Sequence, residues 1–189
     1  MEFMKRLFDL ILALILILPA GLVILLAAIP VWIESRANPI FVQVRVGRQQ
    51  SLFRLIKLRT LLPDTADMAS HQVSIDRVMR SGKFFRKTKI DELPQVLNIL
   101  LGQMSFVGPR PCLPSQAELR SAREKRGVYT LMPGITGIAQ IRGIDMSTPE
   151  ELAIADASYL GSWSIIVDLH LLAVTAFGVG RGDALGKRA

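Results

Sequence analysis

The chain has 189 residues, half of them hydrophobic but only 6% aromatic, and its formal net charge is +7. This length indicates one domain with an appended segment, and a basic, aliphatic chain fits an anionic membrane surface or a phosphate-bearing substrate. Nucleic acid is not an expected partner, because the basic residues are scattered and form no nucleic-acid-binding motif. The single cysteine, Cys112, excludes an intrachain disulfide, and no Cys/His cluster indicates zinc.

The first predicted element is an apolar segment from residue 10 to residue 33, which carries no charge. It is long enough to cross a hydrocarbon core of about 30 Å, and it is too long for a secretory signal peptide. Pro19 and Gly21 predict a kink near its middle. Cationic residues flank both ends, and such residues concentrate on the cytoplasmic side of membranes, so a hairpin that returns to one face satisfies this rule twice. A straight span is the alternative that these residues leave open.

Short strands and helices follow this segment. Residues 40–46 and 52–58 have the β-branched, partly alternating pattern of strands and flank a turn at Gly47, so they predict a β-hairpin. Leucine and valine at helical spacing predict a helix over 93–101, with Gly102 as its stop. Further helices are predicted over 76–86, 114–125 and 149–160.

Three later segments have special features. The prolines on both sides of Arg110 exclude a helix, fix an extended segment and direct the arginine side chain. Residues 132–137 have the composition of a turn. Residues 163–179 are apolar but contain Asp168, and an ionised aspartate is costly at the centre of a bilayer. This last segment therefore predicts an amphipathic helix lying in the membrane interface, with Trp163 at the level of the headgroups.

Asp91 and Glu92 lie side by side in the stretch KIDELPQVLNILLGQ, which begins at Lys89. One interpretation is a helix start, in which Asp91 is the N-cap and Glu92 complements the helix dipole. The other interpretation is chemical. An aspartate can attack a phosphoryl group to form an acyl phosphate. A neighbouring glutamate can hold Mg²⁺, which takes few carboxylates together with substrate phosphates.

The cations of the chain favour the chemical interpretation. Arginine binds phosphate bidentately, lysine binds it as a point charge, and both neutralise charge on a transferring phosphoryl group. The candidates are Lys57, Arg59, Arg86, Arg110 and Arg142. Composition and spacing alone thus indicate a membrane-associated protein that handles phosphates.

The order of these motifs resembles that of the bacterial sugar transferase family, the small monotopic phosphoglycosyl transferases. The resemblance extends from about residue 5 to residue 177, and its central stretch, RKTKIDELPQVLNILLGQMSFVGPRP, is highly specific. The other matching pieces are KRLFD at 5–9, PIFVQVRVGR at 39–48, FRLIKLRT at 53–60, PGITGIAQIRG at 133–143 and the spaced motif D..Y...WSIIVDL at 156–169.

The resemblance implies an α/β, helix-dominated monotopic membrane protein with a re-entrant helix–break–helix, a small β-hairpin and interfacial amphipathic helices. It divides the chain into a re-entrant membrane helix over 1–36, a catalytic phosphoglycosyl transferase domain over 37–180 and a basic tail over 181–189. It places the protein in the bacterial inner membrane, with the active site on the cytoplasmic face and membrane lipids as partners. It leaves the oligomeric state open, a homo-oligomer included.

The resemblance also implies a reaction. The family aspartate, here Asp91, attacks the β-phosphate of a UDP-sugar with the help of Mg²⁺, and UMP leaves. The phosphosugar held by the enzyme then passes to polyprenol phosphate (undecaprenyl phosphate), giving a polyprenyl-diphosphate-sugar. Glu92, with Asp91 nearby, is the implied metal ligand. Lys57, Arg86 and Arg110 fall on family positions near the phosphates, and Arg142 is a displaced candidate for the same role.

The chain departs from the family pattern at several positions. Gln103 replaces the acid of the usual GDMS motif, Met132 replaces an arginine before PGITG, and Ile144 stands near a usual Gly-Arg pair. The usual Ser-Pro break of the membrane segment is replaced by Pro19 and its neighbours. A catalytically inactive, membrane-bound scaffold is therefore the alternative function. A membrane-anchored basic module that binds anionic lipid is a third.

Overall fold

The computed structural model describes residues 2–65 and 73–178. The predicted basic tail over 181–189 lies outside the described residues. Seven α-helices are found in the described part of the chain, so the predicted helix-dominated α/β class is confirmed. They are α1 (Glu2–Ser35), α2 (Arg80–Thr88), α3 (Gln95–Leu100), α4 (Ala117–Lys125), α5 (Ile138–Ile141), α6 (Pro149–Ala157) and α7 (Ile165–Ala176). Short 3-10 turns are η1 (Arg48–Gln50), η3 (Ile75–Arg77), η4 (Ile90–Glu92) and η5 (Val128–Thr130).

The predicted β-hairpin is confirmed with the predicted bounds. Strands β1 (Ile40–Val46) and β2 (Leu52–Leu58) pair antiparallel, and Val42 lies opposite Ile56. Phe53 and Leu55 on one face of β2 are buried in one apolar cluster. Leu58, on the opposite face of the strand, is buried in another cluster with Ala27 and Val31 of α1.

A second, parallel strand pair was not predicted. Strand β3 (Ser105–Val107) pairs with β4 (Gly134–Thr136), which lies in the segment predicted as a turn. The two strands approach so closely that a Cβ on Gly134 would stand 2.1 Å from the amide nitrogen of Gly108. The glycines that indicate a turn by composition serve here to let two backbones meet.

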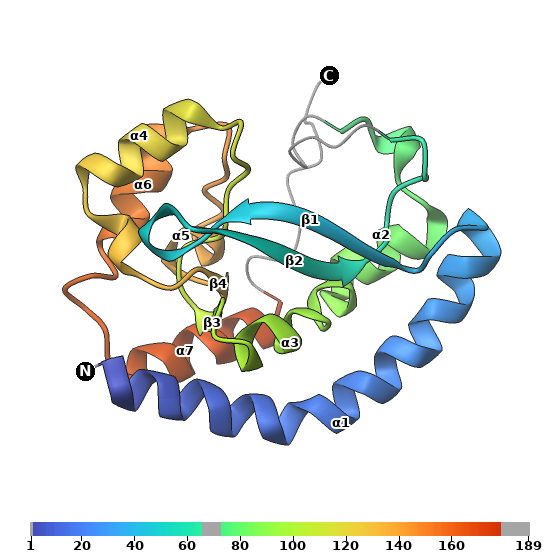
Figure 1. The fold of residues 1–189 in the computed structure, drawn as a ribbon, viewed down its shortest axis with the longest axis horizontal. Helices are drawn as coiled ribbons and strands as arrows, with labels where there is room; N and C mark the ends of the chain where they lie inside the picture. The colour runs from blue at the N-terminus through green and yellow to red at the C-terminus, as the bar shows by residue number, and fades with distance from the viewer. Residues whose placement is uncertain (1, 66–72, 179–189) are drawn as a thin grey trace.

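The membrane segment is one helix and not the predicted helix–break–helix. α1 continues through Pro19 and Pro30, and Figure 1 shows it following a curved path beneath the other elements. A proline removes one backbone donor and crowds the preceding turn, which can bend a helix without unwinding it. The helix is therefore not unwound at Pro19–Gly21, and the predicted re-entrant course stays a prediction. By length and composition α1 could cross a membrane.

Charged side chains fix the first turns of α1 to the rest of the molecule. Lys5 Nζ lies 2.6 Å from Asp168 Oδ2 on α7. Arg6 donates to the carbonyl groups of Ile99 and Leu100 at 2.6 and 3.1 Å. These carbonyls belong to the C-terminal turn of α3, where helix carbonyls lack intrahelical partners and attract cations.

The last turn of α1 is attached to the same body. Glu34 accepts hydrogen bonds from the backbone amides of Arg80 and Ser81, at 2.5 and 3.0 Å. These amides begin α2, where unpaired N–H groups favour a carboxylate. Near the other end, Asp9 accepts from the amide of Phe106 at 3.1 Å. Both ends of α1 are therefore bonded to one body.

Large apolar side chains are exposed between these attachments. α7, which lies beside the first half of α1 (Figure 1), adds further exposed apolar residues. Soluble monomers rarely expose contiguous apolar surface of this extent. The exposed residues include Leu14, Ile15, Leu18, Leu22, Leu25, Leu26 and Ile29 of α1, and Ile166 and Leu169 of α7.

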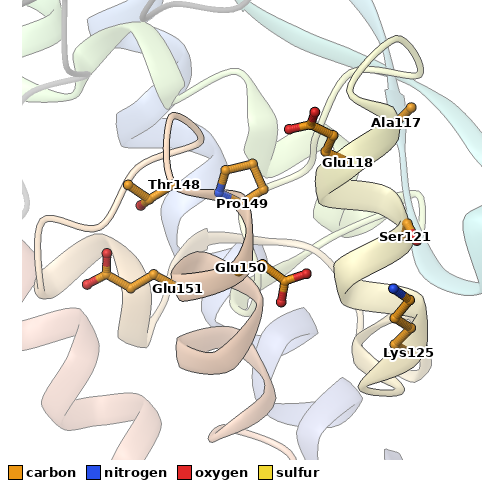
Figure 2. A pocket seen from close by; sticks show the side chains of 8 residues that line it. All are labelled: Ala117, Glu118, Ser121, Lys125, Thr148, Pro149, Glu150 and Glu151. Carbon is orange, nitrogen blue, oxygen red and sulfur yellow. The ribbon is translucent and has the colours of Figure 1, made fainter.

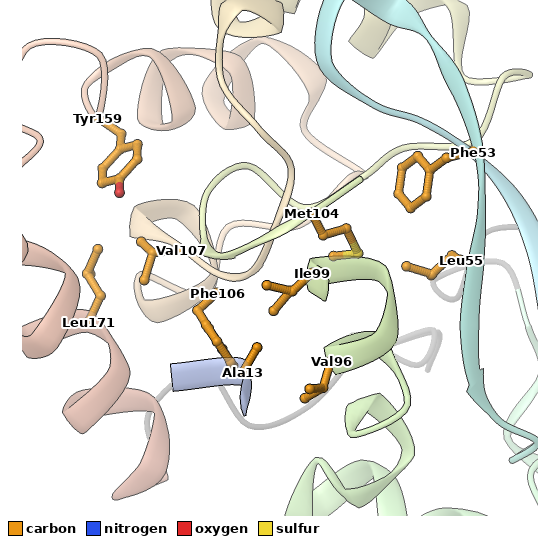
Figure 3. Close-up of a cluster of buried hydrophobic side chains, with 10 residues drawn as sticks. All are labelled: Ala13, Phe53, Leu55, Val96, Ile99, Met104, Phe106, Val107, Tyr159 and Leu171. Atoms are coloured by element: carbon orange, nitrogen blue, oxygen red, sulfur yellow. The ribbon is translucent and has the colours of Figure 1, made fainter. Parts of the chain in front are cut away.

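The main core lies between α1, the hairpin and α7 (Figure 3). Ala13 of α1 and Leu171 of α7 meet Val96 and Ile99 of α3 and Phe106 of β3 there. Trp163, predicted at the headgroup level, packs against this cluster and is partly buried. The amphipathic helices therefore share one core with the hairpin.

The polar interruption of α7 has a structural explanation. Asp168 is fully buried and accepts hydrogen bonds from Lys5 and from the hydroxyl of Tyr159. Burial, followed by this hydrogen bond, raises the pKa of Tyr159, so its hydroxyl remains protonated and donates. Asp168 is thus the buried acceptor that ties α7 to α1.

Replacing Lys5 by methionine leaves the buried carboxylate of Asp168 without its cation. We expect a loss of about 3 kcal/mol or more in the free energy of unfolding, because breaking a buried ion pair strands the remaining charge. Arg126→Met, which removes a more exposed pair with Glu150, is the control and should cost less than about 1 kcal/mol. Thermal unfolding in detergent measures both, and a loss for Lys5→Met no larger than the control would contradict the interpretation.

Candidate active site

Asp91 and Glu92 lie on the short turn η4, between two helices. α2 ends where Lys89 takes a left-handed conformation, with φ of 60°. Pro94 then precedes α3, and its fixed φ suits a helix start. The N-cap positions of η4 and α3 are Lys89 and Pro94, and neither has a side-chain cap. Asp91 is therefore not the N-cap of the apolar helix, and the helix-start interpretation is wrong.

Both acids are buried, with 5% and 6% of their surfaces exposed for Asp91 and Glu92. A buried carboxylate is costly unless it is paired. Glu92 Oε1 accepts from Arg110 Nη1 at 2.8 Å, and Lys89 Nζ lies 3.7 Å from Glu92 Oε2. The structure thus brings the arginine between the two prolines to Glu92, and its predicted phosphate-binding role stays a prediction.

The contact between Lys89 and Glu92 was not predicted from the sequence. Lys89 lies three residues before Glu92, and on a helical turn residues at this spacing are neighbours. The signal was therefore present in the basic run that ends at Lys89. Its left-handed backbone, which no sequence pattern predicts, places it at the turn.

The other predicted cations surround the pair less directly. Arg86 is buried on α2, which packs against η4, and its Nε donates to Thr60 Oγ1 at 2.8 Å. Lys57 belongs to β2, which also packs against η4, and its Nζ lies 5.4 Å from the centre of the Phe41 ring. Arg59 lies over the same ring, at 5.5 Å. Arg86 and Lys57 thus lie on the elements that pack against η4.

Arg142 is not brought to the acid pair by any contact in the described structure. It is exposed just after α5. Among the described residues, its side chain makes no hydrogen bond or ion pair, so its predicted phosphate-binding role stays a prediction.

The acid pair lies beside the second half of α1. Ile90, which directly precedes Asp91, packs against a cluster that contains Ala27 and Val31 of α1 and Leu58 of β2. The apolar helix and the hairpin therefore position η4 together. The site lies where the exposed apolar surface of α1 meets the polar body.

The acids fit a magnesium ion. Glu92 Oε2 is buried and has no hydrogen-bond partner, which leaves a carboxylate oxygen available for a metal. No three His, Cys, Asp or Glu side chains are arranged so that they could hold a metal ion together in the part of the chain that the structure describes. Mg²⁺ does not require one, since it binds through one or two carboxylates plus substrate phosphates and water.

The departure at Gln103 has a structural explanation. Asn98, which is fully buried, donates through Nδ2 to Gln103 Oε1 and to the carbonyl of Arg54, both at 2.7 Å. Its Oδ1 accepts from the amide of Ile56 at 3.0 Å. The position of Gln103 therefore requires a hydrogen-bond acceptor, which a glutamine supplies as well as an acid does.

The other departures lie in apolar surroundings. Met132 lines a cavity of about 550 Å³ near the start of α1, together with Leu131 and Trp163. Ile144 packs against a buried cluster that contains Cys112. Neither Met132 nor Ile144 contacts Glu92 in the described part of the chain.

A second cavity lies between α4 and α6, with a volume of about 790 Å³. Figure 2 shows Glu118 on α4 and Glu150 and Glu151 on α6 around it, with Lys125 as the one cation among its lining residues. Like charges repel, so three carboxylates disfavour a phosphate. This cavity is not the candidate active site.

The family model described as bacterial sugar transferase matches residues 1–182, almost the whole chain and all of the site described above. The chain belongs to the bacterial sugar transferase family. The predicted family is thereby confirmed.

Relatives in this family carry names that state an activity. The chain is 38% identical to the UDP-glucose:undecaprenyl-phosphate glucose-1-phosphate transferase of Caulobacter vibrioides over 177 residues, 89% of this chain and 66% of that protein. It is 35% identical to the undecaprenyl-phosphate glucose phosphotransferase of Komagataeibacter xylinus, covering 90% of this chain and 35% of that protein. It is 36% identical to the uncharacterized sugar transferase EpsL of Bacillus subtilis, covering 91% and 85%. The chain thus spans about two thirds of the length of the Caulobacter vibrioides protein. It spans about one third of the length of the Komagataeibacter xylinus protein.

The role of Asn98 in this sugar transferase leads to a testable result. In Asn98→Asp a carboxylate faces two oxygen acceptors, so we expect a loss of about 2–3 kcal/mol in the free energy of unfolding. Gln103→Glu keeps one acceptor oxygen and is the matched control, with a much smaller loss expected. Chemical denaturation in detergent measures both. Equal losses in the two variants would contradict the assigned hydrogen bonds.

Proposed function

We propose that this bacterial sugar transferase transfers a sugar-1-phosphate from a UDP-sugar to a polyprenol phosphate. The observation that carries the proposal is the buried acid pair on η4, with Arg110 at 2.8 Å from Glu92. A nucleophile and a metal ligand for phosphoryl transfer need such a carboxylate pair beside fixed cations. The names of the relatives support UDP-glucose as the first donor to test.

The reaction runs in two steps through Asp91. A carboxylate oxygen of Asp91 attacks the sugar-linked phosphorus of the donor. The phosphorus–oxygen bond to the other phosphate breaks, and UMP leaves with the electron pair. A phosphate oxygen of the polyprenol phosphate then attacks the same phosphorus, and the Asp91–phosphorus bond breaks. The products are a polyprenyl-diphosphate-sugar and the free carboxylate.

The chain's own cations stabilise the charge that moves during these steps. Arg110 and Lys89, which meet Glu92 in the structure, would turn to the diphosphate when the donor binds. Arg86 and Lys57, on elements that pack against η4, would add further positive charge. Glu92 would hold Mg²⁺ through Oε2. Bound there, the metal supplies Lewis-acid neutralisation of the diphosphate.

The attachments of α1 support a monotopic placement. Both ends of α1 are bonded to one body, whereas a helix that spans a bilayer separates its ends by about 30 Å of hydrocarbon. A curved α1 that enters and leaves by one face buries its exposed leucines in lipid and keeps η4 at the headgroup level. Cations at both ends favour the cytoplasmic face of the inner membrane. There the site meets the phosphate of a polyprenol lipid.

Asp91→Asn should lower UMP release at least roughly 1,000-fold, because the amide cannot act as the nucleophile. The measurement uses detergent- or nanodisc-held protein with Mg²⁺, undecaprenyl phosphate and a panel of UDP-sugars. Radiolabelled donor without acceptor reports the covalent adduct by mass and by gel.

Asp64→Asn, which alters a surface carboxylate paired with Arg77, is the control and should keep full activity. Turnover retained in Asp91→Asn would refute the assigned nucleophile. A wild-type chain that is inactive with every donor would support the inactive scaffold.

Glu92→Gln should raise the Mg²⁺ concentration needed for half-maximal activity by roughly 10- to 100-fold, since it removes a charged oxygen from the proposed ligand. The glutamine keeps the shape of the side chain, so a folded protein is expected. Titration of Mg²⁺ into chelator-treated enzyme gives the value. An unchanged Mg²⁺ dependence would place the metal elsewhere.

A further inference from the structure

The segment from Gly108 to Cys112, which contains Arg110, is bonded at every carbonyl from Pro109 onward. The carbonyl of Pro109 accepts from the amide of Gly134 at 2.9 Å, and that of Cys112 accepts from the amide of Val46 at 2.9 Å. The two carbonyls between them, those of Arg110 and Pro111, accept from arginine side chains.

These arginines are Arg123 on α4 and Arg45 on β1. Arg123 Nη1 donates to the carbonyl of Arg110 at 2.9 Å, and Arg45 Nη1 donates to the carbonyl of Pro111 at 3.1 Å. Both side chains come from elements far from residue 110 in the sequence. Together they hold the two peptide groups that meet at the α-carbon of Pro111, directly after Arg110.

Both guanidinium groups are buried, which is costly without compensation. The side chain of Arg123 is 2% exposed, and its Nε and Nη2 donate to Asp156 Oδ2 at 2.9 and 2.6 Å. Arg45 Nε donates to Gln43 Oε1 at 3.0 Å. Asp156 and Gln43 therefore orient the two guanidinium groups, and each group directs one N–H at a carbonyl of the segment.

The other side of the segment is closed by backbone. A Cβ on Gly108 would stand 2.2 Å from the carbonyl oxygen of Met132. Gly108 itself donates to the carbonyl of Thr136 at 2.8 Å. The segment cannot shift towards β4, and the two arginines prevent a shift away from it. The prolines on both sides of Arg110 remove the remaining rotational freedom.

We propose that Arg45 and Arg123 are positioning residues for Arg110. They hold the two peptide groups that follow the Arg110 α-carbon, so that its side chain reaches Glu92 and, on the proposed function on which this inference rests, the diphosphate of the donor. Arg45 and Arg123 position Arg110 and do not bind the phosphate themselves. Their guanidinium N–H groups already donate to Asp156, to Gln43 and to the two carbonyls. A lysine cannot replace Arg123, since one ammonium group cannot reach both sides of a planar fork.

A double-mutant cycle tests the assignment. Arg123→Lys should slow adduct formation roughly 10- to 100-fold in the wild-type background, the size expected when a catalytic group is misplaced. In the Arg110→Lys background the same change should slow it less than about 2-fold, because a residue that acts through Arg110 has nothing left to position. Arg45→Lys should behave in the same way. Arg126→Lys, at the residue that directly follows α4 and is paired with Glu150 of α6, is the matched control and should leave the rate unchanged.

A second measurement does not depend on activity. Cys112 is the chain's single cysteine, is fully buried, and ends the held segment. Arg123→Lys and Arg45→Lys should each speed the labelling of Cys112 by a thiol reagent under native conditions by about 10-fold or more, because a loosened segment opens more often. Val96→Ala, a cavity variant in the other core cluster, shows how much a general loss of stability contributes.

The outcomes separate the two proposals. The positioning role is supported if Arg123→Lys slows adduct formation only when Arg110 is present and also speeds the labelling of Cys112 more than Val96→Ala does. Equal rate losses in both backgrounds, or labelling no faster than in Arg126→Lys, would overturn it. If the wild-type chain forms no adduct with any donor, the proposed function fails, and the labelling rates still decide whether the arginines hold the segment.

Discussion

The structure depends on the charged side chains that tie both ends of one apolar helix to the same body. α1 exposes most of its large side chains, so apolar contacts alone hold it weakly to the protein. At one end Lys5 reaches the buried Asp168, and at the other Glu34 caps the start of α2. Without Lys5 the buried carboxylate of Asp168 would lose its cation, which is costly. The bonds of Glu34 are exposed, and they place a carboxylate at the positive start of α2. The helix is therefore held in a curve against one body.

The curved α1 helps to position the acid pair, Asp91 and Glu92. Ile90 packs against the second half of α1, and the next two residues are the acid pair. On the opposite side, the segment around Arg110 is held by Arg45 and Arg123. Two separately supported parts therefore meet at the contact between Arg110 and Glu92. A diphosphate at that contact would find cations close by on a held backbone, so that only their side chains need to turn from Glu92.

The departures from the family pattern show why residue identity alone misleads. Gln103 lacks the family acid, yet its amide oxygen accepts the hydrogen bond that Asn98 offers. A motif position with a structural acceptor tolerates any acceptor of suitable reach, whereas a nucleophile does not. Asp91 and Glu92 are unchanged, and the altered residues lie in supporting positions. The loss of an acid at Gln103 therefore gives no reason to expect an inactive protein.

The sequence by itself determined the hairpin over residues 40–58, the helix-dominated class, the family and the acid pair, because these follow from local alternation and from a contiguous motif. Tertiary structure alone decided the rest. It carries α1 through Pro19 without a break, turns the PGITG segment into a strand, and uses Lys89 and Arg123 at the site. These features depend on contacts between residues far apart in the chain or on a left-handed backbone, and neither leaves a periodic or compositional signal in the sequence.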